Sequence, residues 1–327
     1  MKSRSKVKSV LIFGAKDHIG SVVARYIRDK APNVLLRVAT HKEENIKSLR
    51  TMFPDAEHVV ADLLDKDSLI AAVKGMEGIF QISPDVFDED TLVDNMVAAC
   101  TDNGCVKHII RVLGTPPGAS FSLVPDELKK YRHYPAMQHL VATQRYQETN
   151  LPVTFVNVAG YYMDDFIRMF APSLFEERTI RVAFDKRLAW IDPVDVAEVS
   201  AELLLSEPEE YTGKVIDVTG NDLCTISAVA DIFTRVLSIK VNYCGDQDKF
   251  YTAIKPIFSQ LWGKEAPDYF MKYFKWETEH DHMFKLTPHV RNIIKREPKL
   301  FASWIDDHRN IFLTRWKENG VDKVMEF

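Results

Sequence analysis

Residues 9–20 read SVLIFGAKDHIG and form the most informative stretch of this chain. The apolar run at 9–13 predicts a short buried strand, and the apolar spacing at 21–30 predicts a helix. A glycine turn at 14–20 joins the two. A strand, a tight glycine turn and a helix together form the cradle that holds a pyrophosphate at a helix N-terminus. The stretch therefore predicts a dinucleotide-binding site.

Asp17 interrupts the glycine pattern of this turn. In the related pattern G-x-x-G-x-x-G, which Gly14 and Gly20 match, a third glycine would stand at position 17. A carboxylate near a pyrophosphate is repelled by about 1 kcal/mol or more, depending on the effective dielectric constant. Lys16 could offset part of this repulsion, or Asp17 could cap the helix and point away. A third interpretation stays open, in which Asp17 caps a helix in a protein that binds no dinucleotide.

Short apolar strands alternate with amphipathic helices through the first half of the chain. This alternation is typical of a parallel sheet that is covered by helices on both faces. We therefore predict an α/β fold with a Rossmann-like, doubly wound parallel sheet. After the first strand, further strands are predicted at 34–39, 58–62, 78–82, 108–113, 153–158 and 214–218.

The second half of the chain is less regular. Residues 190–195 are expected to begin a helix that continues through Leu205, and residues 241–327 combine mostly helical spacing with many aromatic side chains. These aromatic residues are too numerous for a solvated tail, so they either close a substrate pocket or form a partner interface. The predicted organisation is a dinucleotide-binding domain, residues 1–158 completed by 188–220, and a smaller, mostly helical substrate lobe, residues 159–187 and 221–327.

The composition argues against several classes of protein. The chain has 327 residues and a net charge of -5, so no broad electrostatic argument favours nucleic acid as a partner. No stretch approaches the roughly 20 apolar residues of a membrane span. The cysteines include no C-x-x-C pair, which favours a reduced, cytoplasmic protein. The sequence HDH at 280–282 has no third ligand nearby, so we expect a solvated turn there and no metal site.

Several short motifs, taken in order, resemble the NmrA-like group of atypical short-chain dehydrogenases/reductases. Besides the glycine turn, they are VADL at 60–63, LPVTFV at 151–156 before YYM at 161–163, WIDPVD at 190–195, and GK at 213–214 before VTG at 218–220. The resemblance implies a fold that binds NADP(H) or NAD(H). Some members of this group reduce small molecules, whereas others have lost catalysis and sense the cofactor or regulate transcription.

The end of the second strand bears on the choice of cofactor. Folds that prefer NAD usually place an acidic residue there, but this chain has Thr40, His41 and Lys42. The resemblance adds that members binding NADP(H) carry an arginine where His41 stands. We therefore expect NADP(H) rather than NAD(H), with Arg37 close enough to help hold a 2′-phosphate. The predicted cofactor residues are Gly14, Lys16, Asp17, His18, Ile19, Gly20, His41, Lys42, the adenine-side pair Asp62 and Leu63, the nicotinamide-side loop Ile82, Ser83 and Pro84, and Ala159.

The catalytic position is a second departure from the family pattern. Reductases of this group place a lysine thirteen residues before the proline of the Leu151-Pro152 pair, and counting back gives His139. A histidine does general acid–base work near neutral pH, with an unperturbed pKa of about 6.5, so turnover would depend on pH between about 5 and 8. We predict His139 as a catalytic residue, with Tyr134 or Tyr161 as proton donor. In the alternative, His139 only contacts the cofactor ribose or lines the pocket.

Tyr161, Tyr162 and Met163 follow the sixth predicted strand, at the carboxyl edge where open α/β sheets bind ligands. We predict that they line the substrate pocket; the alternative is ordinary core packing.

Three functions remain open on the sequence. The first is an NADP(H)-dependent oxidoreductase acting on a hydrophobic, aromatic or polycyclic small molecule. The second is a non-catalytic NADP(H)-binding sensor or regulatory protein, and the third is a redox-neutral isomerase or lyase on the same fold. For each we expect a monomer or homodimer with a small-molecule ligand and no membrane contact.

Overall fold

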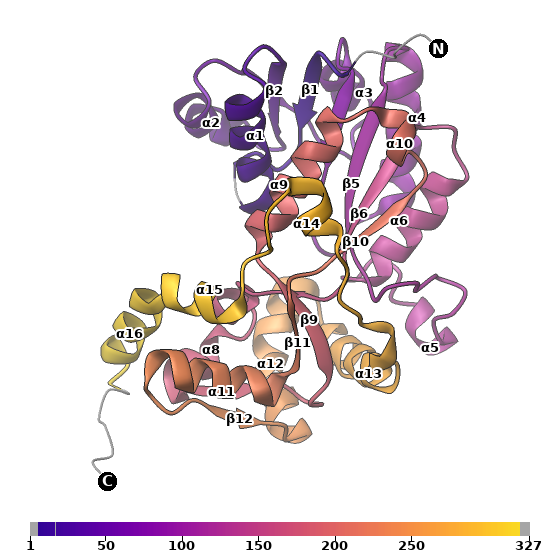
Figure 1. Ribbon diagram of the computed structural model, residues 1–327. Coiled ribbons are helices and arrows are strands. Elements are labelled where there is room, and N and C mark those ends of the chain that lie inside the picture. The colour runs from indigo at the N-terminus through magenta and orange to yellow at the C-terminus, as the bar shows by residue number, and fades with distance from the viewer. Residues whose placement is uncertain (1–5, 17, 321–327) are drawn as a thin grey trace.

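The first lobe of the molecule is built on one parallel sheet. The computed structural model describes residues 6–16 and 18–320, and Figure 1 shows the sheet lobe above a second, smaller lobe. The sheet has seven strands in the order β10-β6-β5-β4-β1-β2-β3, and every neighbouring pair is parallel. The predicted Rossmann-like sheet is thereby confirmed. Its strands are β1 (Ser9–Ile12), β2 (Leu35–Thr40), β3 (Glu57–Val60), β4 (Gly78–Gln81), β5 (His108–Gly114), β6 (Val153–Val158) and β10 (Val215–Val218).

The strand order reverses beside β1. This strand pairs with β2 on one side and with β4 on the other. Such a reversal leaves a crevice outside the carboxyl ends of the strands, where open α/β sheets bind ligands. The glycine turn follows β1 and residues 82–84 follow β4, so both predicted motifs reach this crevice.

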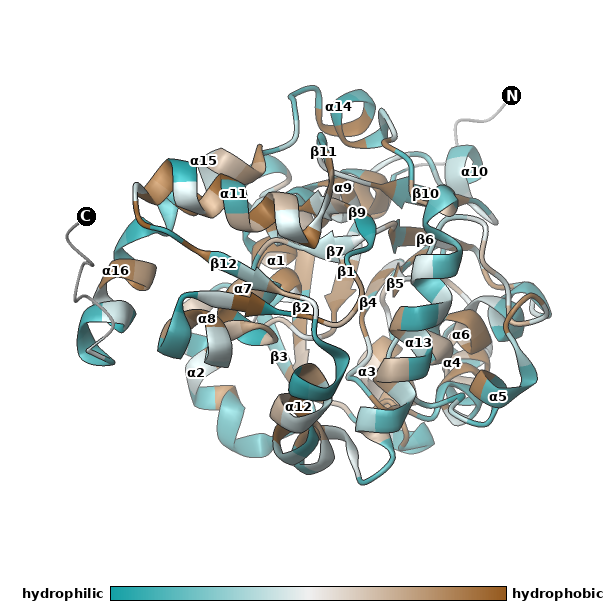
Figure 2. Ribbon diagram, turned by 90° about the horizontal axis from the view of Figure 1, so that it is seen from below, coloured by the Kyte–Doolittle hydropathy of each residue, from teal (hydrophilic) through white to brown (hydrophobic). Residues whose placement is uncertain are grey.

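Helices cover both faces of the sheet. Because successive side chains of a strand point to opposite faces, Val10 and Ile12 join one apolar core and Leu11 joins the other. In Figure 2 the strands of the sheet are mainly brown, whereas α10 (Pro208–Tyr211), at the periphery, is mainly teal. One face carries α1 (His18–Lys30), α9 (Pro193–Leu205) and α14 (His289–Ile294), and the other carries α3 (Lys66–Val73), α4 (Glu89–Asn103) and α6 (Met137–Gln147).

The second lobe combines two small sheets with a group of helices. In the larger sheet, β9 (Arg187–Ile191) lies between β7 (Tyr161–Tyr162) and β11 (Asp222–Thr225). In the smaller, β8 (Thr179–Arg181) pairs with β12 (Asn242–Cys244). Within the described residues, no helix is both long and apolar enough to cross a membrane. The helices of this lobe are α5 (Asp126–Lys129), α7 (Asp165–Arg168), α8 (Ala171–Glu177), α11 (Ile226–Leu237), α12 (Gln247–Trp262), α13 (Ala266–Glu279), α15 (Phe301–Asp307) and α16 (Arg309–Glu318).

One predicted helix begins later than the sequence suggested. Trp190 and Ile191 belong to strand β9, and helix α9 begins only at Pro193. The residue before a proline is driven away from helical geometry, and Asp192 has the extended angles φ -70° and ψ 128°. The Asp192 side chain accepts a hydrogen bond from the Val194 N–H at 2.9 Å and so caps the helix. The proline therefore marks a strand-to-helix boundary.

Candidate active site

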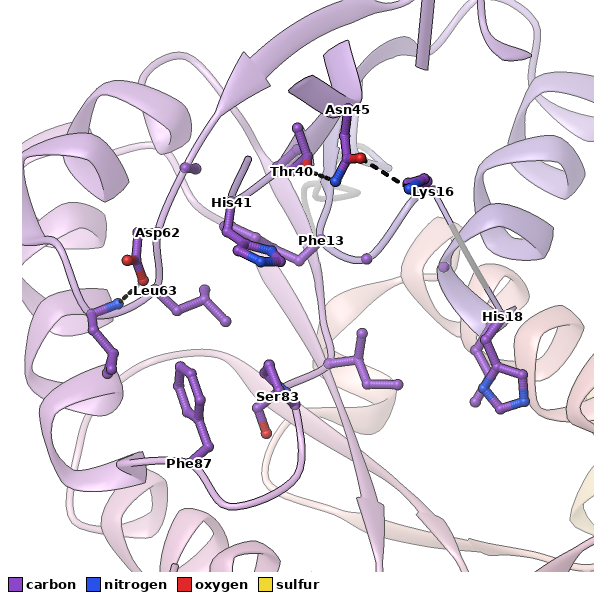
Figure 3. Close-up of a pocket in the computed structure, with 18 residues that line it drawn as sticks. Phe13, Lys16, His18, Thr40, His41, Asn45, Asp62, Leu63, Ser83 and Phe87 are labelled. Atoms are coloured by element: carbon purple, nitrogen blue, oxygen red, sulfur yellow. Dashed lines mark hydrogen bonds between the residues drawn. The ribbon is translucent and has the colours of Figure 1, made fainter. Parts of the chain in front are cut away.

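A cavity of about 570 Å³ opens at the crevice beside β1, and we call it the glycine-turn cavity. Figure 3 shows its lining side chains converging from the ends of β1, β2, β3 and β4. Lys42 and Ala159 are not among the lining residues, and Asp17 lies outside the described residues. The predicted cofactor residues that line it are Gly14, Lys16, His18, Ile19, Gly20, His41, Asp62, Leu63, Ile82, Ser83 and Pro84.

Two glycines fix the shape of this cavity at the start of α1. Gly14 has a φ of +69°, in the left-handed region that favours glycine, and a Cβ there would lie 2.9 Å from Ile82 Cγ2. A Cβ on Gly20 would lie 2.3 Å from the carbonyl oxygen of Gly14. Only glycine at position 20 lets the helix begin so close to the turn. The N-terminus of α1 is thus held against the cavity, where its free N–H groups suit an anion.

A polar cluster lines the end of β2 in the same cavity. Lys16 Nζ donates to Asn45 Oδ1 at 2.9 Å, and Asn45 Nδ2 donates to Thr40 Oγ1 at 3.2 Å (Figure 3). His41 lies beside these residues and also lines the cavity. Arg37, by contrast, is occupied elsewhere: its Nε donates to Glu57 Oε2 at 2.7 Å. The expected help from Arg37 is therefore absent, whereas Asn45, which sequence reasoning missed, belongs to the site.

A second cavity of about 430 Å³ lies between the two lobes, and we call it the aromatic cavity. Its walls include His139, Tyr161 and Tyr162 from the predicted set. The other lining residues are Asp85, Gly114, Thr115, Pro116, Pro135, Ala136, Val158, Gly160, Asp165, Arg168, Met169, Leu261, Trp262, Phe270, Tyr273, Glu277 and Phe284.

The two cavities are neighbours. Pro84 lines the glycine-turn cavity, and the next residue, Asp85, lines the aromatic cavity. His18 lines the first cavity, and its ring packs edge-on against that of Tyr162, which lines the second, with centroids 5.5 Å apart. His18 Nε2 also lies 2.8 Å from Asp164 Oδ2 at the start of α7. The glycine turn is therefore bonded directly to the second lobe.

Two of the residues proposed for catalysis and substrate binding lie outside both cavities. The ring of Tyr134 packs against Tyr131 and Tyr269, with centroids 5.5 and 5.0 Å away. Tyr134 is thus placed to pack rather than to give a proton to a substrate. Met163 is fully buried in the core of the second lobe, so its contribution is core packing and not pocket lining.

His139 lies in the aromatic cavity but does not titrate where the sequence suggested. Burial, and next the positive charge of Arg111, lower the pKa of His139 to about 3. The expectation of a value near 6.5 is corrected on this point. Its Nδ1 atom is buried and has no hydrogen-bond partner among the described residues. At neutral pH the ring is therefore an uncharged imidazole.

Tyr161 takes part in a buried polar cluster that sequence reasoning missed. Its hydroxyl donates to Glu277 Oε2 at 2.8 Å and accepts from Lys186 Nζ at 3.0 Å. Lys186 and Glu277 form an ion pair and are 1% and 2% exposed. The sequence carries a faint signal for both, because each is a charged residue inside an apolar or aromatic run, VAFDKRLAW and YFKWETE. That signal gives no indication that the two meet.

The fold and these cavities define a Rossmann-like α/β protein with a ligand site at its topological switch point. The chain belongs to the NmrA-like family, whose model matches residues 6–283. It is 27% identical over 259 residues to the nitrogen metabolite regulation-like protein bik4 of Gibberella fujikuroi, covering 72% of this chain and 76% of that one.

Solved structures share the fold at low sequence identity. The NADPH-dependent quinone oxidoreductase QOR2 of Escherichia coli, complexed with NADPH, has a TM-score of 0.73 and 18% identity, with 92% of this chain and 100% of that chain covered. The negative transcriptional regulator NmrA in complex with NADP has a TM-score of 0.68 and 18% identity, with 97% and 99% covered. The fold is thus shared by an enzyme and a regulator.

Proposed function

We propose that this protein is an NADP(H)-dependent oxidoreductase that reduces a hydrophobic, aromatic small molecule. The observation that carries the proposal is the adjacency of the two cavities, one built around a glycine turn and the other walled by aromatic side chains. Ligand sites of this kind are concave, mostly apolar and supplied with a few polar groups. In this proposal the dinucleotide occupies the first cavity and the substrate occupies the second.

The residues of the glycine-turn cavity fit NADP(H). Because Gly20 has no side chain, the start of α1 lies against the Gly14 carbonyl and its N-terminus faces the cavity, which suits a pyrophosphate. Lys16 brings positive charge close to the end of β2, His41 adds a ring that can donate a hydrogen bond, and no carboxylate stands at the position that recognises the ribose of NAD. NADPH is accordingly the favoured form. QOR2 and NmrA, which share the fold, are complexed with NADPH and NADP, and this agrees with the choice.

His139 and Tyr161 have different roles in the proposed reaction. Bound NADPH supplies the hydride, and the protein orients the substrate and supplies a proton. Tyr161 is the proton donor in this proposal, because it lines the aromatic cavity and carries an O–H group. Burial, and next the charge of Glu277, raise the pKa of Tyr161 well above the ordinary value, so the phenol is protonated. The neutral His139 ring contributes a hydrogen bond and shape rather than the positive charge of the family's lysine.

A titration tests the cofactor assignment. NADPH and NADH are added separately to the full chain, and nucleotide fluorescence is followed. We expect tighter binding of NADPH; equal or reversed affinities would contradict the assignment. NADPH consumption is then measured with a panel of aromatic ketones and quinones, and no consumption with any of them counts against the reductase proposal.

A second candidate is a non-catalytic NADP(H)-binding sensor. It is favoured by the uncharged His139 at the lysine position and by the likeness to a nitrogen metabolite regulation-like protein. The same titration separates the two candidates, since a sensor binds NADPH but consumes none. His139→Lys sharpens the distinction, because it returns the family's residue to the aromatic cavity: gain of turnover in this variant alone indicates a sensor derived from a reductase.

A further inference from the structure

Five residues contribute to the walls of both cavities. Residues 83–87, SPDVF, lie between strand β4 and helix α4, and we call them the partition segment. Ser83, Pro84 and Phe87 line the glycine-turn cavity, whereas Asp85 lines the aromatic cavity. Figure 3 shows Ser83 and Phe87 on the lower wall of the first cavity. The conformation of this segment therefore affects the shape of both sites.

Val86 gives the partition segment a strained backbone. It has a φ of +55°, in the left-handed region where a β-branched residue crowds its own backbone. The Val86 side chain is 37% exposed, so its burial offsets little of this strain. A conformation of this kind persists only where the surrounding groups hold it. The segment must therefore be restrained on both sides of Val86.

Gln138 supplies that restraint. This residue of helix α6 is fully buried, and its side-chain amide spans the strained position. Its Nε2 donates to the Pro84 carbonyl oxygen at 2.8 Å, and its Oε1 accepts from the Phe87 N–H at 2.9 Å. A buried amide is costly without partners, so both bonds favour the observed conformation of the segment.

Two further contacts tie the segment to its surroundings. The Ser83 hydroxyl donates to Glu89 Oε1 at 2.5 Å and accepts from Arg111 Nη2 at 2.7 Å, and both charged side chains are buried. The Trp262 side chain, at the end of α12, is a hydrogen-bond partner of the Asp85 carboxylate. Trp262 also lines the aromatic cavity. The segment thus connects the core of the sheet lobe to the wall of the aromatic cavity.

We propose that Gln138 is a positioning residue that couples the two cavities. By holding the strained segment, it keeps Phe87 in the glycine-turn cavity and Asp85 beside Trp262. Gln138 itself lines neither cavity, so its effect on a ligand passes through the segment. A nucleotide then meets a wall that is already ordered, which lowers the entropy cost of binding. The inference rests on the proposed assignment of the glycine-turn cavity to NADP(H).

The coupling follows from the rigidity of the segment. A nucleotide that packs against Phe87 displaces a restrained segment as a unit, so Asp85 and its partner Trp262 move with it. A segment released from Gln138 absorbs the same displacement by changing its own φ and ψ angles. The aromatic cavity therefore responds to nucleotide only while Gln138 is in place.

The first test is Gln138→Leu, which keeps a side chain of similar size and removes both bonds. The Phe87 N–H retains a second acceptor, the His133 carbonyl oxygen at 3.0 Å, so the protein should fold. NADPH binding, followed by nucleotide fluorescence, should weaken by about tenfold. An unchanged NADPH affinity would overturn the proposal.

Asn103→Leu is the matched control. The Asn103 amide bridges neighbouring backbone groups in the same way, since Oδ1 accepts from the Gly75 N–H at 2.7 Å and Nδ2 donates to the Met76 carbonyl at 2.9 Å. These residues line neither cavity. The control variant should lose stability and keep its NADPH affinity. Equal weakening in both variants would mean that Gln138 acts only through general stability.

A rescue separates positioning from filling of the core. Val86→Gly removes the strain, so together with Gln138→Leu it should return the NADPH affinity to within about threefold of the unmodified protein. Glycine at an exposed position cannot replace a lost core side chain. No recovery in the double variant would therefore contradict the positioning role.

Tryptophan emission tests the coupling. Saturating NADP⁺, which does not itself fluoresce, should change the emission of the unmodified protein, and Trp262→Phe should abolish this change. In Gln138→Leu the change should be absent at saturation. A change that persists in either variant overturns the coupling, as does no change in the unmodified protein.

The strain is tested without any nucleotide. Val86→Gly should raise the midpoint of thermal unfolding by about 1–3 °C, whereas Val215→Gly, at a strand position of similar exposure, should lower it. A lower midpoint for Val86→Gly overturns the strain and the positioning role with it. Gln138-dependent binding of NADPH without any consumption contradicts only the oxidoreductase function. Absence of NADPH binding contradicts that function and the coupling together, and the valine variants then decide the positioning role alone.

Discussion

The glycine-turn cavity and the aromatic cavity are built by different means. The first is shaped by backbone and by the glycines of one short stretch, with a few side chains from the strand ends. The second is assembled from side chains far apart in the chain, such as His139, Tyr161 and Glu277, and depends on how two lobes meet. The first therefore tolerates change in side chains but not in backbone, whereas the second depends on partners that must be changed together.

The largest expected effect is a loss of folding stability, and it comes from the ion pair beside the aromatic cavity. Lys186→Met leaves Glu277 buried without its cation, and breaking a buried ion pair in this way costs about 3–5 kcal/mol. Denaturant unfolding should show this loss. The double variant Lys186→Met with Glu277→Leu should recover most of it, because neither charge remains. A single variant as stable as the unmodified protein would mean that water reaches the pair.

The next largest effect is on the shape of the glycine-turn cavity and on nucleotide binding there. Gly20→Ala places a Cβ against the Gly14 carbonyl oxygen, so the turn must shift, at a cost of about 1–3 kcal/mol. NADPH binding should be lost, as followed by nucleotide fluorescence. Gly118→Ala is the control: unlike Gly20 it has a positive φ, of +72°, but its Cβ would meet no atom within 4 Å. It should lose some stability and keep nucleotide binding.

These differences explain what the sequence could reveal. The sheet and the glycine-turn cavity follow from local patterns, because strand periodicity and the turn act over about twenty residues. Tyr161 was found because it follows a strand at the carboxyl edge. Lys186 and Glu277 could not be paired from sequence, since 91 residues separate them and only tertiary packing brings them together. Tyr134 was predicted as a possible proton donor, but its ring packs against the rings of Tyr131 and Tyr269, a contact that the sequence does not reveal.

A third effect is a dependence of folding stability on pH, caused by His139. Its pKa in the folded state is about 3, against about 6.5 when unfolded, so the unfolded chain binds the extra proton between these values. The stability contributed by the neutral ring is therefore present above about pH 6.5 and is lost as pH falls toward 3. His139→Gln should remove this dependence.

The comparison is made between pH 7 and pH 5. The unmodified protein should lose about 2 kcal/mol more than the variant over this interval, measured by urea unfolding. Equal losses would show that the His139 ring is solvated. The test uses the difference between two proteins because Asp165, whose pKa burial raises to about 8, contributes with the opposite sign to both.

The smallest effect concerns the rim of the glycine-turn cavity. His41 lines the cavity and is exposed, and an exposed charge interaction is worth about 0.3–1 kcal/mol. His41→Ala should therefore weaken NADPH binding by about two- to fivefold and leave NADH binding unchanged. Lys42→Ala is the matched control, because Lys42 is the next residue along the chain but does not line the cavity. Fluorescence titrations at low and high salt check the result, since the His41 contribution should fall as ionic strength rises. If Lys42→Ala weakens NADPH binding as much as His41→Ala, the two side chains act through long-range electrostatics. Direct contact of His41 with the 2′-phosphate would then not explain the preference for NADPH.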